Sequence, residues 1–283
     1  MQKLKEIQIP IKQHIEIFEK KFKASMKSKV PMLDIITRYI IKRKGKQMRP
    51  MFVFLSAGVL GGITESGYRA AGDYLLSRGL LLALEHDEYQ LLKIVSNATR
   101  EMSEGELLQI EKARRLDIDE EIYFEIIRKK TASLIASCCA AGAASAGADK
   151  EMVDRMHRFG EYVGIAFQIK DDLFDYQENK LMGKPNGIDI KEQKMTLPLI
   201  HMLNNSGFME KRKIINIVKN HNNNPEKVAQ VIAKVNRSGG IEYAYNKMIE
   251  YQQKAFGILH QFPESTMRSS LENLVIFTTE RNK

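Results

Sequence analysis

Hydrophobic residues recur along this chain at intervals of three and four, the period of an amphipathic helix. The clearest stretch covers residues 151–179, whose buried face is marked by Val153, Met156, Gly160, Val163 and Phe167. A second stripe near the start is formed by Ile7, Ile11, Ile15 and Phe18. No stretch shows the regular alternation of a half-buried β-strand, so the pattern predicts an all-α fold.

Turn and capping signals divide this pattern into separate helices. The predicted helices cover residues 1–26, a segment opened by Pro31, 49–60, a segment beginning near Thr64, 88–111, 119–129, 131–148 and 151–179. A polar loop is predicted at 183–194. Four more helices fill the C-terminal third, separated at Gly207, 222–224 and 238–240. Because no proline- or glycine-rich linker divides the chain, residues 1–283 are predicted to form a single domain.

The charge balance narrows the choice of partners. Lysine and arginine total 44 against 35 aspartates and glutamates, a formal net charge of +9. Such a balance suits nucleic acid, an anionic membrane surface or phosphorylated small substrates. The basic residues are spread along the chain without an arginine-rich block or a nucleic-acid motif, so no nucleic-acid partner is predicted.

Residues 131–148 carry no charge over 18 positions, but small side chains dominate the segment. Small residues gain little from lipid and allow neighbouring helices to approach closely, so we expect an interior helix and no transmembrane segment. Cys138 and Cys139 lie within it and are expected to be unpaired core residues in a reducing compartment. The start of the chain lacks the apolar core of a signal peptide. These features predict a soluble, cytoplasmic protein.

Asp171, Asp172 and Asp175 are the strongest candidates for chemistry. At about 100° per residue, Asp171 and Asp175 share nearly one helix face, with Asp172 one step around. Aspartate disfavours the helix interior, because its side chain competes for backbone hydrogen bonds. Two carboxylates one turn apart can hold Mg²⁺, which completes its shell with water and phosphate oxygens. A solvated acidic helix end is the alternative, but the apolar run at 163–167 favours the mouth of a cavity.

Three basic segments are candidate anion sites. Gly45, Lys46 and Arg49 precede a helix start, where a glycine and two cations suit a phosphate group. A plain basic helix cap explains them equally well. Lys130 lies where a charged helix meets the uncharged one, and Lys184 lies in a glycine-containing turn shortly after the aspartates. Taken separately, the first is an ordinary solvated lysine and the second an ordinary turn.

Taken together and in order, these segments give the chain a family resemblance. It resembles the trans-isoprenyl diphosphate synthases, or polyprenyl synthetases, over about residues 30–205. The matching motifs are Gly45-Lys46-x-x-Arg49-Pro50, Lys130-Thr131, Phe167-Gln168, Asp171-Asp172-x-x-Asp175, Gly183-Lys184-x-x-Gly187-x-Asp189 and Thr196-Leu197-Pro198. Each motif is weak alone, but six in the expected order make the match specific.

The resemblance implies a bundle of antiparallel helices around a deep apolar cavity, and a homodimer. It implies condensation of isopentenyl diphosphate with an allylic diphosphate, assisted by Mg²⁺. By matching positions, Gly45, Lys46 and Arg49 bind the isopentenyl diphosphate, and Phe167 lines that site. Asp171, Asp172 and Asp175 bind the metal. Lys130 and Lys184 neutralise the leaving diphosphate, while Thr131 and Gln168 present oxygens to the allylic cation.

One departure from the family matters more than the rest. The family carries an earlier aspartate-rich motif followed by a pair of arginines, and the printed sequence has neither. Family-like sequence on both sides joins directly at Ala71 and Gly72, as though several tens of residues were missing. Gln193 is a smaller departure, since glycine is usual there.

Three explanations are open. A segment of the protein is absent from the sequence as printed, which we favour. Alternatively, the segment is truly deleted and the chain is an inactive partner subunit of a synthase. Third, the chain is a class I terpene cyclase, although Lys46 and Arg49 argue against this, since a cyclase has no second diphosphate to bind. Product length stays open, because in this family it depends on side chains just before the missing motif.

Overall fold

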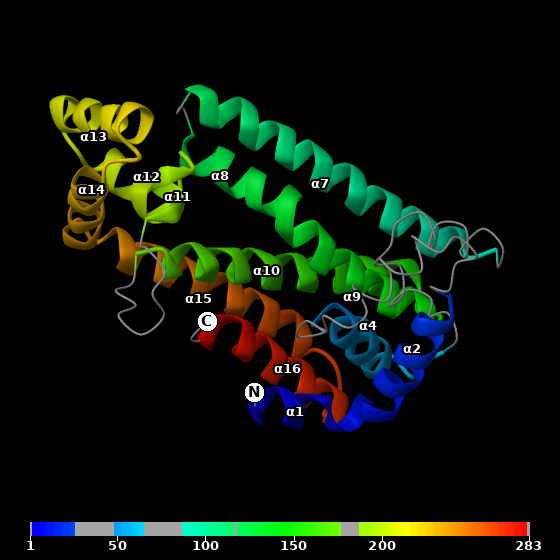
Figure 1. Ribbon diagram of the computed structural model, residues 1–283. Coiled ribbons are helices and arrows are strands. Elements are labelled where there is room, and N and C mark those ends of the chain that lie inside the picture. Colours follow the sequence, from blue (N-terminus) through cyan, green and yellow to red (C-terminus); the bar gives the residue numbers. More distant parts are fainter. Residues whose placement is uncertain (1, 26–47, 65–86, 116–117, 177–186, 282–283) are drawn as a thin grey trace. The chain divides into compact units, whose positions relative to one another are not determined.

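The computed structural model describes residues 2–25, 48–64, 87–115, 118–176 and 187–281. Every regular element in these ranges is helical, which confirms the all-α prediction (Figure 1). The elements are α1 (Gln2–Gln8), η1 (Ile9–Ile11), α2 (Lys12–Ser25), α4 (Met48–Val59), α7 (Tyr89–Arg115), α8 (Glu120–Ile127), η2 (Arg128–Ala132), α9 (Ser133–Ser145), α10 (Lys150–Phe174), α11 (Ile188–Lys191), α12 (Leu197–Asn204), α13 (Phe208–Asn220), α14 (Pro225–Arg237), α15 (Gly240–Leu259) and α16 (Thr266–Glu280).

The chain divides into two compact units. The first unit comprises Met1–Thr99, Leu134–Gly160 and Ala255–Phe277, and the second comprises Arg100–Ser133, Glu161–Lys254 and Thr278–Lys283. That residues 1–283 act as a single domain remains a prediction from the sequence.

The hydrophobic stripe near the start of the chain lies in the core of the first unit. Its four members, Ile7, Ile11, Ile15 and Phe18, are all buried, as the spacing predicts. Phe18 meets Phe54 of α4 edge to face, with ring centroids 6.0 Å apart. The predicted helix 1–26 is interrupted by the 3-10 turn η1 around Pro10, because proline has no N–H for the helix ladder.

Small residues bring α9 close to its neighbours in the first unit. A Cβ atom added at Gly142 would lie 2.4 Å from the carbonyl oxygen of Val53. One added at Gly160 would lie 2.7 Å from the Cα atom of Ala136. These approaches confirm that the uncharged segment is a tightly packed interior helix. Neither Cys138 nor Cys139 forms a disulfide, as expected.

In the second unit, α8 runs into the π-helical turn η2, without the predicted break near residue 130. A Cβ atom added at Gly164 of α10 would lie 2.4 Å from the Cα atom of Ala132. One added at Gly105 of α7 would lie 2.7 Å from the backbone nitrogen of Lys130. Two glycines therefore admit the backbone of this turn, which places Lys130 and Thr131 beside α10.

The helices α11 to α14 form a group of short helices in the second unit (Figure 1). The loop predicted at 183–194 contains α11, and Gly187 precedes this helix in the left-handed conformation. The Asn224 side chain caps α14, accepting from the Glu226 and Lys227 nitrogens. Residues 197–280 contain five helices, one more than predicted, because the chain turns near Pro263 between α15 and α16.

No helix within the described ranges is both long enough and apolar enough to cross a membrane. The helices predicted to start at Pro31 and near Thr64 fall outside those ranges, as does the Ala71–Gly72 junction. The gap at that junction therefore stays a prediction.

Candidate active site

Three aspartates end α10, and the fold gives each carboxyl group different surroundings. The Asp171 side chain is 55% exposed. Asp172 is buried, with 7% of its surface exposed. Asp175 lies just beyond the last residue of α10, and its carboxylate faces the first turn of α11. The spacing predicted one shared metal site, but the three carboxyl groups have different surroundings in the structure.

Asp172 is the centre of a hydrogen-bonded chain inside the second unit. The Tyr123 hydroxyl donates to Asp172 Oδ2 at 2.7 Å, and Gln168 Nε2 donates to Asp172 Oδ1 at 2.9 Å. The Thr131 hydroxyl donates to Gln168 Oε1 at 2.8 Å. The structure therefore brings Thr131, Gln168 and Asp172 together, and it adds Tyr123 to the residues predicted from sequence.

Burial, followed by repulsion from the nearby Asp189 carboxylate, raises the pKa of Asp172 from 3.8 to about 7. The hydrogen bonds from Gln168 and Tyr123 act in the opposite direction, because they stabilise the ionised carboxylate. Burial, followed by the Asp172 carboxylate, raises the pKa of Tyr123 well above 10. Its hydroxyl therefore stays a donor at neutral pH and holds Asp172 in place.

Asp175 accepts hydrogen bonds from the first turn of α11. Its two carboxylate oxygens accept from the backbone nitrogens of Ile188 at 2.9 Å and Asp189 at 3.1 Å. Burial, followed by repulsion from Asp175, raises the pKa of Asp189 to about 6, although Lys194 opposes the shift. Asp175 thus ties the end of α10 to the start of α11.

Asp171 contacts a residue from the opposite end of the chain. Nη2 of Arg281 lies 3.1 Å from Asp171 Oδ1. The guanidinium stacks 4.0 Å from the ring centroid of Phe167 and 5.5 Å from that of Phe174, with 12% of the side chain exposed. Lys170 lies over the same Phe174 ring, and burial, then Arg281, lowers its pKa. The predicted residues Phe167 and Asp171 thus share one cation, Arg281, which the sequence did not indicate.

Lys130 lies in the π turn η2, and its charge is paired. Its Nζ atom lies 2.5 Å from Glu106 Oε2 and donates to Gln109 Oε1 at 2.9 Å, both on α7. π turns of this kind occur often at functional sites, because they redirect side chains within a helix. Here the turn places Lys130 next to Thr131, whose hydroxyl reaches Gln168.

The structure does not place the remaining predicted residues relative to this cluster. Arg49 lies at the start of α4 in the first unit and is exposed. Gly45, Lys46 and Lys184 fall outside the described residues. Their roles in substrate binding stay predictions.

The donor chemistry at the end of α10 suits a hard divalent cation. Asp171 offers an accessible carboxylate, and Mg²⁺ is held in proteins by one or two carboxylates together with phosphate oxygens. The described ranges contain no group of three or more acidic, histidine or cysteine side chains placed to enclose a metal ion. Of the three aspartates, Asp171 is the exposed one, and it forms an ion pair with Arg281.

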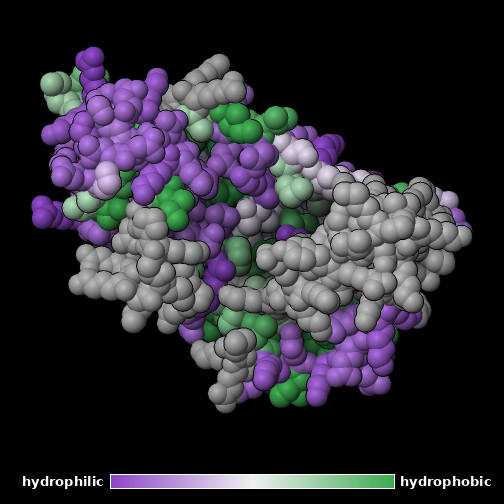
Figure 2. Space-filling view, viewed as in Figure 1, coloured by the Kyte–Doolittle hydropathy of each residue, from purple (hydrophilic) through white to green (hydrophobic). Residues whose placement is uncertain are grey.

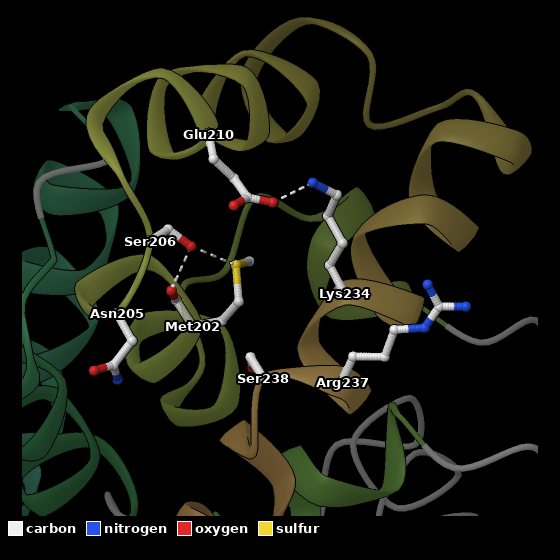
Figure 3. A pocket seen from close by; sticks show the side chains of 7 residues that line it. All are labelled: Met202, Asn205, Ser206, Glu210, Lys234, Arg237 and Ser238. Carbon is white, nitrogen blue, oxygen red and sulfur yellow. Dashed lines mark hydrogen bonds and ion pairs between the residues drawn. The ribbon is translucent and has the colours of Figure 1, made fainter.

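A cavity of about 430 Å³ opens elsewhere in the second unit, among α12, α13 and α14 (Figure 3). Its lining is Met202, Asn205, Ser206, Glu210, Lys234, Arg237 and Ser238. None of the residues predicted from sequence lines it, so it is separate from the aspartate cluster.

Comparison with known proteins gives this cluster a family context. The family model for polyprenyl synthetases matches residues 66–235, more than half of the chain. The chain belongs to the polyprenyl synthetase family.

Relatives within the polyprenyl synthetase family cover almost the whole chain. An all-trans-nonaprenyl-diphosphate synthase (geranyl-diphosphate specific) of Rhodobacter capsulatus is 29% identical, over 98% of this chain and 97% of its own. Component 2 of the heptaprenyl diphosphate synthase of Bacillus subtilis is 27% identical, over 94% and 88%. The crystal structure of a geranylgeranyl pyrophosphate synthase from Bacteroides thetaiotaomicron is 33% identical with a TM-score of 0.87, covering 99% of this chain and 100% of the solved one.

The length of one alignment bears on the gap predicted between Ala71 and Gly72. The alignment with the Rhodobacter synthase spans 319 positions, which exceeds the 283 residues of this chain by 36. At least that many positions of this polyprenyl synthetase relative therefore have no counterpart here.

Proposed function

We propose that this chain is a prenyltransferase that condenses isopentenyl diphosphate with an allylic diphosphate to give a longer trans-polyprenyl diphosphate. Membership of the polyprenyl synthetase family carries the proposal. The hydrogen-bonded chain from Thr131 through Gln168 to Asp172, beside the accessible Asp171, supports it. These residues suit a reaction through a cation, which needs oriented oxygens and no nucleophilic side chain.

The metal in this proposal is Mg²⁺, with Asp171 as its principal protein ligand. Held there, Mg²⁺ would supply positive charge to the allylic diphosphate, whose carbon–oxygen bond ionises as diphosphate leaves. Lys130 and Lys184 add positive charge at the leaving group. The double bond of isopentenyl diphosphate then forms a carbon–carbon bond to the allylic carbon, and the released diphosphate accepts the proton lost from the product.

Thr131 and Gln168 are proposed to stabilise the allylic cation. The proton of the Thr131 hydroxyl is committed to Gln168 Oε1, which leaves the hydroxyl lone pairs available to a positive charge. The Gln168 amide is fixed in turn, because its nitrogen donates to Asp172. Fixed dipoles stabilise a developing charge without having to reorganise during the reaction.

We also propose that the protein acts as a homodimer. The second half of α7 exposes Met102, Leu107 and Ile110, of which Leu107 is 67% exposed. Such a face on a long helix suits contact with a second copy. The name of the Bacillus relative, component 2, makes a heteromeric assembly the alternative. Mass measurement in solution with and without Leu107→Glu distinguishes a dimer from a monomer.

The cytoplasm is the proposed compartment. Neither of the adjacent residues Cys138 and Cys139 forms a disulfide, and Cys139 is buried. Unpaired buried cysteines are typical of proteins from reducing compartments.

The comparisons support neither alternative function. The relatives described above are polyprenyl diphosphate synthases and not terpene cyclases. Family-like sequence on both sides of Ala71–Gly72 supports a missing segment more than a dedicated inactive partner.

A product assay tests the proposed function. The intact protein is incubated with Mg²⁺, isopentenyl diphosphate and farnesyl diphosphate, and the products are identified by mass spectrometry. A ladder of diphosphates that grows by five-carbon units is expected. Cyclic hydrocarbons from farnesyl diphosphate alone would identify a cyclase, and an absence of product from the intact protein would favour the inactive partner.

A further inference from the structure

The first turn of α13 is unusually apolar for an exposed element. Phe208 and Met209 open the helix, and each is 77% exposed, the highest values among the large apolar side chains of the described ranges. The N-cap residue is Gly207, whose position provides no side-chain cap. A helix start without a cap, with two large apolar side chains in water, is unfavourable to local stability.

Three consecutive cations follow these two residues. Lys211, Arg212 and Lys213 are exposed, and none has an ion-pair partner among the described residues. Cations near the positive N-terminal end of a helix are unfavourable, because the helix dipole repels them. The one acid in this turn, Glu210, precedes these cations and is paired with Lys234 of α14.

The cavity beside this turn shows how the charges are separated. In Figure 3, Glu210 and Lys234 point toward each other across the cavity, whereas Arg237 points away from the pair. The charge of Glu210 is therefore balanced by Lys234, whereas Lys211, Arg212 and Lys213 have no such partner among the described residues. Figure 2 shows hydrophobic surface next to hydrophilic surface over α13, at the upper left.

We propose that this basic tip, formed by Phe208, Met209, Lys211, Arg212 and Lys213, docks on an anionic lipid surface. The two apolar side chains enter the region between headgroups and acyl chains, while the three cations contact lipid phosphates. Several local stability rules are broken at this one turn, which is expected where a functional surface replaces a stable one.

A lipid surface fits these residues better than a protein partner. Stable protein interfaces bury about 800 Å² per partner around an apolar centre, and two apolar side chains on one turn provide far less. A weak, reversible membrane contact needs only a few apolar residues and several cations. The inference rests on the proposed function in one respect, since a polyprenyl diphosphate is an amphiphile whose delivery a membrane contact would assist.

Vesicle sedimentation tests this proposal. The full chain, without substrate, is mixed with phosphatidylcholine vesicles that contain either no anionic lipid or about 30% phosphatidylglycerol. Wild-type protein is expected to sediment with the anionic vesicles only, and to be released at about 1 M salt because charges are then screened. Phe208→Ala/Met209→Ala and Lys211→Glu/Arg212→Glu/Lys213→Glu are each expected to lower partitioning by about tenfold or more.

Matched variants control for hydrophobicity and net charge. Tyr245→Ala removes another exposed apolar side chain, and Lys93→Glu/Lys150→Glu/Lys227→Glu makes the same charge change elsewhere. Both are expected to sediment like wild type, and circular dichroism confirms that every variant is folded.

Several outcomes would overturn the proposal. It fails if wild type ignores anionic vesicles, or if the tip variants bind as well as the controls do. A change of self-association in the lipid-free Phe208→Ala/Met209→Ala variant would instead identify a contact between copies of this chain. Because no substrate is present, the result is independent of whether the protein is a prenyltransferase.

Discussion

Asp171 and Asp172 are adjacent, yet their carboxyl groups meet opposite environments. Asp171 faces solvent and Arg281, whereas Asp172 is buried against Tyr123 and Gln168. We predict that Asp171→Ala lowers turnover of the intact enzyme by orders of magnitude and leaves the fold unchanged. Removal of a metal ligand costs several kcal/mol of transition-state stabilisation, and each ~1.4 kcal/mol is tenfold in rate. Steady-state kinetics with varied Mg²⁺ measures the loss.

Exposed carboxylates elsewhere provide the control for this prediction. Asp154→Ala alters an exposed aspartate near the start of α10 and should leave turnover unchanged. Near-normal turnover of the Asp171 variant, or of wild type in excess chelator, would contradict the mechanism.

The buried carboxyl group of Asp172 predicts how stability depends on pH. In the unfolded chain its pKa is near 3.8, and in the folded protein it rises to about 7. Between these values the folded protein binds a proton that the unfolded chain releases, so stability falls as the pH rises from about 4 to about 7. Asp189, with a pKa of about 6, contributes in the same direction. Urea titrations of metal-free protein across this range measure the slope.

Asp172→Asn removes the ionisable group and should flatten that slope, while the Asp189 contribution remains. An unchanged pH dependence in this variant would show that other groups control it. Excess chelator is needed throughout, because a bound metal would favour the ionised carboxylates.

Tyr123 is predicted to hold Asp172 in place through its hydroxyl. Tyr123→Phe keeps the buried ring but leaves a buried carboxyl group with one donor fewer, which costs about 1–3 kcal/mol of stability. Chemical denaturation measures this loss. Tyr245→Phe removes an exposed hydroxyl and serves as the control. If the two variants are equally stable, the Tyr123 hydroxyl does not stabilise the buried Asp172.

Sequence spacing identified the residues on α10 because their pattern is local. Three aspartates within five positions are visible without knowledge of the fold. The partners of these residues are not visible, since Tyr123 and Asp172 are 49 positions apart and Asp171 and Arg281 are 110 apart. Tertiary packing brings these groups together, and hydrophobic periodicity in the sequence does not predict such contacts.

At the scale of elements, the glycines of the second unit decide how closely helices approach. Gly164→Ala would place a methyl group 2.4 Å from the Cα atom of Ala132. Because two backbones must then separate, we expect a loss of about 1–3 kcal/mol or more in the free energy of unfolding. Gly257 of α15 has nothing within 4 Å of its added Cβ atom. Gly257→Ala should stabilise the protein by about 0.5–1 kcal/mol, because alanine favours the helix.

Thermal and urea unfolding of the two glycine variants check these opposite signs. A neutral Gly164→Ala variant would mean that α10 and the turn η2 can move apart freely. Such a result would also weaken the placement of Thr131 against Gln168, which depends on the same close approach.

Long amphipathic helices were predictable from the sequence, whereas their interruptions were predictable only in part. The buried stripe of α10 and the Asn224 cap of α14 follow from local rules that the fold obeys. The π turn at Arg128–Ala132 has no local signal, because it lies against two glycines of other helices. The short helix α11 depends on Asp175, which accepts from its first two backbone nitrogens.

For the whole molecule, the main question is whether the 283 residues are the complete enzyme. The family resemblance continues on both sides of Ala71–Gly72, but the earlier aspartate-rich motif and its arginines are missing. The alignment with the Rhodobacter relative spans 319 positions, whereas this chain has 283 residues. Loss of such a segment removes metal ligands and diphosphate-binding cations together, so a chain that truly lacks it cannot assemble the proposed site.

We therefore predict that the native protein contains several tens of residues between Ala71 and Gly72. Intact-mass spectrometry of protein isolated from its source should give a mass above the 32.4 kDa of the printed sequence, and peptide mapping should place the additional residues at this junction. The longer protein should bind Mg²⁺ and diphosphate together and form product. A mass of 32.4 kDa, with a tryptic peptide that joins Ala71 directly to Gly72, would contradict the prediction. The chain would then serve best as the inactive partner of a synthase, and co-purification with a second, aspartate-rich subunit would be its expected behaviour.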